Sequence, residues 1–154
     1  NQSGMPCWMV FNVGDSRTYL LREGALTQVS VDHSSTRAGA NGVAPRNVIT
    51  RALGAGLASP VVDQWLIPAQ AGDRVMICSD GLTNEVTPEL MAATLLTEPE
   101  PQAAAGSLVA SALNAGGRDN VTVVVVDCEA VVSTAVATGG LDTTASDTVK
   151  EEES

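Results

Sequence analysis

Two short acidic motifs are the part of this chain whose residue types and spacing could do chemistry. Asp80 lies in Ser-Asp-Gly, just after the apolar run 74–78, and Asp119 lies in Gly-Arg-Asp-Asn, just before the apolar run 121–126. If these runs are neighbouring antiparallel strands, both carboxylates reach the same rim of a sheet. Two such carboxylates repel each other unless a hard cation lies between them, and Mg²⁺ and Mn²⁺ prefer oxygen ligands. The motifs therefore predict a metal-dependent hydrolase site.

The composition predicts one domain and excludes one class of partner. The chain has 154 residues, of which 44% are hydrophobic and only 3% aromatic, so aliphatic side chains must fill the core. Its formal net charge is −10. Because contacts to phosphate backbones need Lys and Arg, nucleic acid is not an expected partner. A solvated acidic surface is enough to account for this negative charge.

The cysteines and the chain ends bear on the compartment. Cys7, Cys78 and Cys128 are odd in number and share no ligand-like spacing, which favours buried, reduced thiols and a cytoplasmic protein. No apolar stretch has the length of a membrane span, and no basic-then-apolar leader opens the chain. The chain begins with Asn1 rather than Met, which predicts that an upstream segment is missing.

The elements that must position the two carboxylates form an α+β pattern. Gly24 marks a hairpin turn and Asp15 lies in another turn, so antiparallel pairing is expected. Thr87 and Pro88 open a predicted helix that runs to about residue 96. The predicted strands cover residues 7–13, 18–22, 26–30, 61–67, 74–78 and 121–126, with a second helix over 102–114, a surface loop or flap over 31–47 and a short ordered piece over 48–53.

The second predicted helix has one apolar face at helical spacing. Its residues follow the i, i+3, i+4, i+7 pattern that a helix uses to pack on a core. The expected buried residues are Ala105, Leu108, Val109, Ala112 and Leu113.

Six short motifs follow one another along the chain: residues 12–17 (NVGDSR), 32–34 (DHS), 51–54 (RALG), 72–73 (GD), 78–81 (CSDG) and 117–122 (GRDNVT). In this order they resemble the C-terminal half of the metal-dependent protein Ser/Thr phosphatases, the PPM or type 2C family, in a bacterial-like form. The resemblance covers roughly residues 9–127 and implies a partial α-β-β-α sandwich of antiparallel sheets flanked by helices, with the N-terminal half missing. It places a phosphatase part at residues 1–130 and leaves 131–154 as an acidic, disordered tail or linker.

The resemblance also implies a site and a reaction. Asp80 and Asp119 match carboxylates on one metal of a binuclear Mn²⁺ or Mg²⁺ centre, and Asp15 matches a position that helps Asp80 hold a third ion. A metal-activated water is then the nucleophile, so no side chain is catalytic. The implied substrates are proteins carrying phosphoserine or phosphothreonine, placed there by a Ser/Thr kinase.

Each of these residues has a structural alternative that the sequence leaves open. Asp80 and Asp15 precede or follow glycine in ordinary turns, and Asp119 could cap a turn through its own side chain. His33, the only histidine, is expected to be structural, and Asn120 to order the turn beneath Asp119. Arg17 and Arg51 are expected to form ion pairs or to anchor loops rather than to bind phosphate.

The chain departs from the family where the N-terminal half would bring a phosphate-binding Arg, a Glu-Asp pair and an Asp that bridges both metals. Residues 1–10 hold no acidic residue. The isolated chain is therefore expected to be an inactive fragment. Two alternatives remain: a non-catalytic pseudophosphatase that binds a partner, and a small-molecule phosphoesterase on the same scaffold.

Overall fold

The computed structural model describes residues 5–37, 46–54 and 61–132, which contain strands from both ends of the chain and three helices. The strands are β1 (Cys7–Asn12), β2 (Arg17–Arg22), β3 (Ala25–Gln28), β4 (Ser34–Arg37), β5 (Arg46–Ile49), β6 (Asp63–Pro68), β7 (Arg74–Cys78) and β8 (Val123–Asp127). The helices are α1 (Asp80–Thr83), α2 (Pro88–Thr97) and α3 (Pro101–Ala115). No helix among the described residues is both long and apolar enough to cross a membrane.

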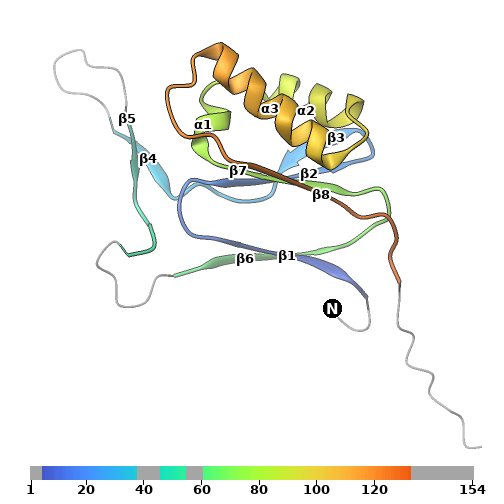
Figure 1. Cartoon of the computed structure of the whole chain (residues 1–154). Helices are drawn as coiled ribbons and strands as arrows, with labels where there is room; N and C mark the ends of the chain where they lie inside the picture. Colours follow the sequence, from blue (N-terminus) through green and yellow to red (C-terminus); the bar gives the residue numbers. More distant parts are fainter. Residues whose placement is uncertain (1–4, 38–45, 55–60, 133–154) are drawn as a thin grey trace, which may run out of the picture.

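The elements stack in three layers. An antiparallel sheet with the order β3-β2-β7-β8 forms the middle layer, and α1, α2 and α3 cover one of its faces. The antiparallel pair β1–β6 lies on the side away from the helices (Figure 1). This is the predicted α+β arrangement of antiparallel sheets flanked by helices, and the fold class is confirmed.

The hydrophobic core lies between the helices and the middle sheet. Along β7 the side chains alternate: Met76 and Cys78 are buried in this core, whereas Ile77 is 45% exposed. This is the period of two that a strand imposes. The core is contributed by Tyr19, Leu21, Met76 and Cys78 from strands and by Leu82, Val86, Met91, Leu95, Ala104, Leu108 and Ala112 from the helical region.

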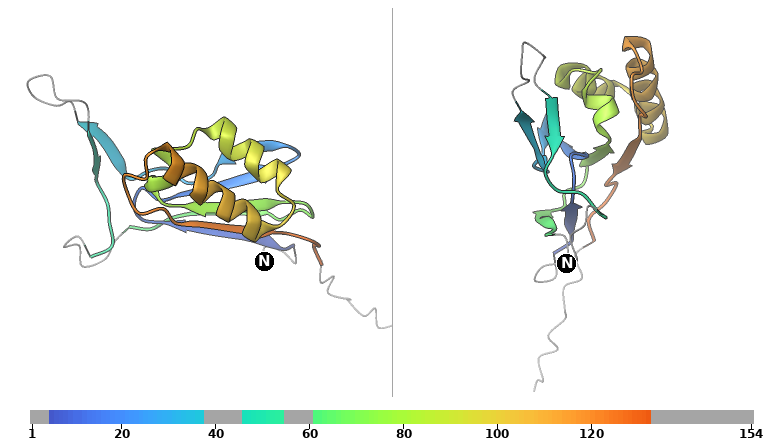
Figure 2. Two further views of the ribbon diagram at one scale, coloured as in Figure 1. Left: turned by 45° about the horizontal axis from the view of Figure 1, so that its top comes forward. Right: turned by 90° about the vertical axis from the view of Figure 1, so that its left-hand side faces the viewer.

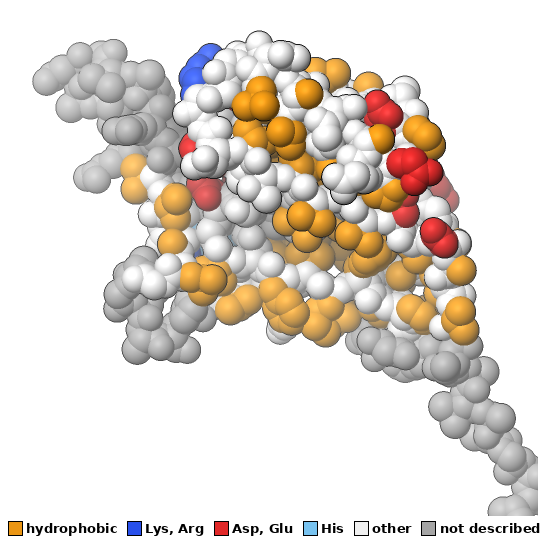
Figure 3. Space-filling view, viewed as in Figure 1, with side chains coloured by type: hydrophobic (Ala, Val, Ile, Leu, Met, Phe, Trp, Pro, Cys, Tyr) orange, Lys and Arg blue, Asp and Glu red, His pale blue; other side chains and the backbone are white. Residues whose placement is uncertain are grey.

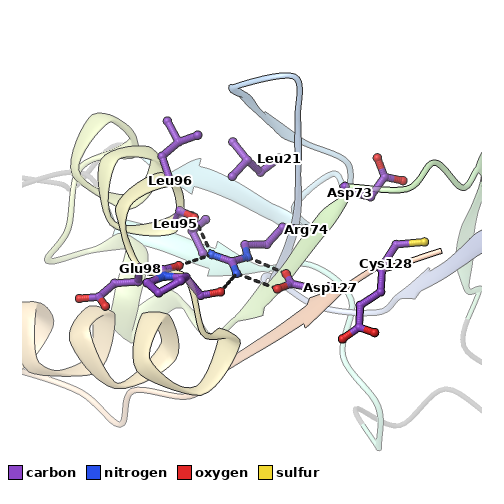
Figure 4. A pocket seen from close by; sticks show the side chains of 11 residues that line it. Leu21, Asp73, Arg74, Leu95, Leu96, Glu98, Asp127 and Cys128 are labelled. Carbon is purple, nitrogen blue, oxygen red and sulfur yellow. Dashed lines mark hydrogen bonds and ion pairs between the residues drawn. The ribbon is translucent and has the colours of Figure 1, made fainter.

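Helix α2 has satisfied groups at both ends. Thr87 accepts a hydrogen bond from the backbone N–H of Leu90 at 3.4 Å, as predicted for the N-cap. At the other end, the Arg74 guanidinium donates to the carbonyls of Leu95 and Glu98 at 2.7 and 2.6 Å (Figure 4). Asp127 holds the same guanidinium through two further bonds. A cation here satisfies carbonyls that the helix leaves free and complements its dipole.

A buried aspartate joins the two sheets. The Asp73 side chain accepts from both Arg22 Nε and Nη2 at 2.7 Å and from the Trp8 indole N–H at 2.8 Å. The backbone N–H of Gln70 donates to it as well, at 2.9 Å. Arg22 is the main reason why the pKa of Asp73 is lowered to about 2, although burial acts in the opposite direction. Trp8 belongs to β1 and Arg22 to β2, so this group fixes the outer strand pair on the middle sheet.

The predicted loop over 31–47 is wrong in part, because β4 and β5 pair as a hairpin. Ser34 lies opposite Ile49 and Ser35 opposite Val48. The hairpin stands away from the layered body (Figure 2). The β4 sequence is Ser-Ser-Thr-Arg, so no apolar alternation marks it as a strand. Of the ordered piece predicted over 48–53, only residues 48 and 49 lie in a strand, at the end of β5.

The buried face of α3 also differs from the prediction. Ala104, Leu108 and Ala112 are fully buried, at a spacing of four, whereas Leu113 is 59% exposed. The face is therefore centred on a narrow stripe of mainly small side chains, because α3 packs closely on α2, α1 and β8. Composition alone does not distinguish Ala104 from Ala105, which lies beside the stripe.

Hydrophobic side chains remain exposed on the strands. Figure 3 shows them along the lower part of the view, over β1 and β6. Met9 and Leu66 lie opposite each other there and are 53% and 47% exposed. Val124 and Val126 of β8 are also half exposed, on a strand that ends the middle sheet. Of the cysteines, none forms a disulfide and only Cys78 is buried, so the expectation of three buried thiols is wrong for Cys7 and Cys128.

Candidate metal site

One end of the middle sheet carries all three predicted ligand residues. Arg17 at the start of β2 lies opposite Cys78 at the end of β7, which in turn lies opposite Val123 at the start of β8. The segments beyond this end of the sheet carry Asp15, Asp119 and Asp80, the last of which begins α1. All three line one cleft of about 630 Å³. The antiparallel arrangement predicted for the two apolar runs is therefore present.

The segments that carry Asp80 and Asp119 are joined through Ser79, which directly precedes α1. Its backbone N–H donates to the carbonyl of Thr122 at 3.1 Å, and its hydroxyl accepts from the N–H of Thr122 at 3.0 Å. The same hydroxyl donates to the carbonyl of Asn120 at 3.2 Å. The two aspartates adjoin these bonded residues, so their separation is set by the sheet rather than by free loops.

The turn that carries Asp15 is held by buried polar groups. The Nδ1 of His33 accepts from the backbone N–H of Gly14 at 3.1 Å, and the N–H of His33 donates to the Gly14 carbonyl at 2.9 Å. Asn12 Nδ2 donates to the same carbonyl at 3.1 Å. Gly14 has a φ of +124°, a conformation that favours glycine. The predicted structural role of His33 is thus confirmed.

The aspartates of the described residues fall into two groups. Four of them are paired with an arginine, and the remaining three, Asp15, Asp80 and Asp119, have no arginine or lysine partner within residues 5–35, 48–54 and 61–132, whose side chains the structure describes. The pairs are Arg17–Asp32, Arg22–Asp73, Arg51–Asp63 and Arg74–Asp127, each with a closest N–O distance of 2.6 or 2.7 Å. The ion pairs predicted for Arg17 and Arg51 are confirmed. All three unpaired aspartates line the cleft, together with Asp32, whose charge Arg17 compensates.

The remaining contacts of these carboxylates are weak or local. Asp80 Oδ2 accepts from Asn84 Nδ2 at 3.4 Å. Asp119 Oδ1 accepts from the backbone N–H of Asn120 at 2.7 Å, so the turn-capping alternative for Asp119 is also present. A carboxylate has about four acceptor positions, which leaves most of them free in each residue.

The donor set suits a hard divalent cation but does not form a closed cage. All three side chains offer carboxylate oxygens, which Mg²⁺ and Mn²⁺ prefer, and both ions keep several waters. Among the described residues, however, no three side chains of His, Cys, Asp or Glu lie close enough together to hold a metal ion. The carboxylates would therefore act as separate ligands that leave positions for water or for further groups.

Two arginines also line the cleft. Arg17 is occupied by Asp32, which accepts from its Nε and Nη2. The Asp32 hydrogen bond is the main cause that raises the pKa of Arg17 further above its ordinary value. Arg118 is 78% exposed along its side chain and has its Nε 3.7 Å from the buried Glu85 carboxylate.

Sequence reasoning did not identify Ser79 as the residue that joins the two loops. Its hydroxyl bonds across 41 and 43 positions of sequence, so no local pattern marks it. It also did not identify Arg118 as part of the cleft. The position of Arg118 next to Asp119 is the sequence signal that could have placed it in the cleft.

Comparison with known proteins gives consistent relatives, although no protein-family model matches the chain. The Ser/Thr protein phosphatase PstP of Mycobacterium tuberculosis is 40% identical over 126 residues, covering 75% of this chain and 24% of PstP. The Ser/Thr phosphatase Stp of Listeria monocytogenes is 34% identical over 129 residues, covering 77% of this chain and 51% of Stp.

Solved structures agree with these sequences. The catalytic domain of PstP in complex with two manganese ions is 36% identical, with a TM-score of 0.59 over 82% of this chain and 54% of that domain. The chain thus spans about a quarter of PstP and about half of Stp.

Proposed function

This chain belongs to the PPM, or type 2C, family of protein Ser/Thr phosphatases, and on that premise we propose that it forms the Asp15–Asp80–Asp119 part of a metal-dependent phosphatase site. The proposed substrates are proteins that carry phosphoserine or phosphothreonine. The proposed ion is Mn²⁺ or Mg²⁺, and the PstP catalytic domain is described in complex with two manganese ions.

The observation that carries the proposal is the contrast between paired and unpaired aspartates. Among the side chains that the structure describes, an arginine pairs with each of Asp32, Asp63, Asp73 and Asp127, whereas Asp15, Asp80 and Asp119 have none and line a single cleft. Their mutual repulsion favours an added cation. A structural role in turns explains each residue alone but not why all three share the cleft.

The residues of this chain would act by holding and orienting charge. Asp80 at the start of α1 and Asp119 before β8 would bind one cation, with Ser79 keeping the two segments in register, and Asp15 would help Asp80 to hold a further ion. When bound, the divalent cation supplies the Lewis acidity that the hydrolysis of a phosphoric ester requires. Arg118 lines the same cleft and can offer guanidinium N–H groups to an anionic substrate.

We also propose that the isolated chain is inactive or nearly so. The described carboxylates do not converge into a cage of three, and residues 1–10 offer no further carboxylate. A short separation between two cations needs a ligand shared by both. Measurable Mn²⁺-dependent hydrolysis of an aryl phosphate by the purified chain, abolished in Asp80→Asn, would overturn this part.

Metal binding itself is tested by titrating the purified chain with Mn²⁺ and recording the electron paramagnetic resonance signal of free Mn²⁺. Asp80→Asn and Asp119→Asn should each weaken binding by about tenfold or more, because a ligand and a charge are lost together. Glu129→Gln is the matched control, since this exposed carboxylate follows the far end of β8. Equal binding by all four proteins would refute the site.

The non-catalytic module is favoured by a different observation, the exposed Met9, Phe11 and Leu66 on the outer strand pair. A module would have no use for uncompensated carboxylates. Saturable binding of a protein partner that survives the double change Asp80→Asn and Asp119→Asn, with no Mn²⁺ binding by the parent chain, would support it.

A further inference from the structure

His33 contacts three separate parts of the molecule through four hydrogen bonds. Two of them go to both backbone groups of Gly14, next to Asp15. The third runs from the backbone N–H of Thr50 to the His33 carbonyl at 2.7 Å. The fourth joins His33 Nε2 to Asp63 Oδ2 at 3.0 Å. The His33 side chain is only 3% exposed, so the bond between its ring and Gly14 is shielded from water.

These bonds determine which ring nitrogen of His33 carries the proton. Nδ1 faces the backbone N–H of Gly14 and must accept, so the proton is on Nε2 and is donated to Asp63. Asp63 is fixed in turn by Arg51, whose Nη1 lies 2.7 Å from Oδ1. The hydrogen bonds from His33 and Arg51, in that order, lower the pKa of Asp63. The ring is therefore held in one orientation from the Asp63 side.

The three parts that His33 joins all border the cleft or support it. Asp15 and Ile49, the last residue of β5, both line the cleft. Thr50 and Arg51 directly follow that strand, so the base of the β4–β5 hairpin is bonded to the same residue that holds the Asp15 turn. A shift of the hairpin must change either these bonds or the position of the turn.

We propose that His33 is a positioning residue that holds Asp15 in the cleft and couples its position to the β4–β5 hairpin. The metal-binding part of this inference rests on the proposed function. The coupling part concerns only bonds within the chain. His33 itself does not line the cleft and is not offered as a ligand or as an acid.

Two conservative variants separate the two sides of the ring. Asn places its Oδ1 near the position of Nδ1 and can still accept from Gly14, but it does not reach Asp63. Gln places its terminal amide near the position of Nε2 and can still donate to Asp63, but it leaves the Gly14 N–H without an acceptor. Both variants are polar and differ from each other by one methylene group.

The first readout needs no metal. Amide hydrogen exchange at Gly14 should accelerate by about tenfold in His33→Gln relative to His33→Asn, as expected when one buried hydrogen bond is lost. Equal exchange at Gly14 in the two variants would overturn the proposal. If His33→Gln fails to fold, Asp63→Asn tests the other side: it should speed exchange at Thr50, and unchanged exchange there would overturn the coupling.

The second readout uses Mn²⁺, whose unpaired electrons broaden nearby NMR signals. In the parent chain and in His33→Asn, broadening should reach Asp15 as well as Asp80. In His33→Gln it should persist at Asp80 and weaken at Asp15, which a uniform loss of stability would not produce. Equal broadening of both residues in both variants would overturn the proposal.

The two readouts also separate this inference from the proposed function. Absence of Mn²⁺ broadening anywhere in the parent chain would refute the metal site. The exchange rates at Gly14 and Thr50 would then still decide whether His33 couples the turn to the hairpin.

Discussion

Gly81 packs backbone to backbone against Asn120, so closely that no side chain fits between them. A Cβ added to Gly81 would lie 3.0 Å from the carbonyl carbon of Asn120 and nearer still to its oxygen. These residues directly follow Asp80 and Asp119. The contact therefore sets how closely the start of α1, with Asp80, approaches the segment before β8, with Asp119.

Gly81→Ala should disturb this approach without touching a carboxylate. The extra methyl group meets rigid backbone, so we expect a loss of about 1–3 kcal/mol in the free energy of unfolding, together with weaker Mn²⁺ binding. Chemical denaturation and Mn²⁺ titration measure the two effects. Gly106→Ala is the control: it lies within α3 with nothing within 4 Å of an added Cβ, and should stabilise the chain by about 0.5–1 kcal/mol. Equal effects of the two changes would contradict this account.

Removing a carboxylate should have opposite effects on stability in the two groups of aspartates. Asp80→Asn relieves repulsion in the cleft and should raise the free energy of unfolding by up to about 0.5 kcal/mol when EDTA removes all metal. Asp127→Asn leaves the Arg74 guanidinium, which is only 11% exposed, without its anion. This change should lower the free energy of unfolding. Thermal unfolding in EDTA distinguishes the two. A clear loss of stability in Asp80→Asn would show that its carboxylate has a structural role.

The stability of the chain should depend on pH through Asp73. Its pKa is lowered from 3.8 to about 2, chiefly by Arg22. Because the folded state holds the lower pKa, the contribution is complete above about pH 4 and is lost as the pH falls towards 2. Urea unfolding between pH 2 and 5 should show this loss, and Asp73→Asn should reduce the slope while costing about 3 kcal/mol at pH 7. An unchanged slope in the variant would assign the acid sensitivity to other carboxylates, such as Asp127.

Arg74→Lys tests whether the end of α2 needs a guanidinium or only a positive charge. Lys cannot bond Asp127 through two nitrogens and also reach the carbonyls of Leu95, Glu98 and Pro99. We expect a loss of about 1–3 kcal/mol in the free energy of unfolding. The exposed Arg118→Lys should change it by less than about 0.5 kcal/mol. A similar result for both would mean that charge alone stabilises the helix end.

The sequence predicted the elements whose apolar pattern is strong. β1, β2, β7 and β8 lie within two residues of their expected bounds, since runs such as Arg74–Cys78 alternate or are continuously apolar. The rim position of Asp80 and Asp119 followed from two such runs. Their role as metal ligands stays a prediction.

Other features depend on contacts that no local pattern records. The β4 strand is polar throughout, and α1 is a single turn of four residues. The choice of Ala104 over Ala105 on α3 depends on how the helix rolls against its neighbours. Which aspartates lack an arginine was also invisible, because partners such as Arg22 and Asp73 lie 51 positions apart.

The order of elements between Asp80 and Asp119 has a consequence for folding kinetics. The three helices α1, α2 and α3 lie between β7 and β8, so the ends of these strands meet only after a long loop closes. The cleft is then absent from the unfolded ensemble, and a bound cation would act on the native state alone. Mn²⁺ should therefore slow unfolding much more than it speeds refolding, which stopped-flow measurements at several Mn²⁺ concentrations would reveal. The bound ion would therefore stabilise the native state and would not promote the formation of a folding nucleus.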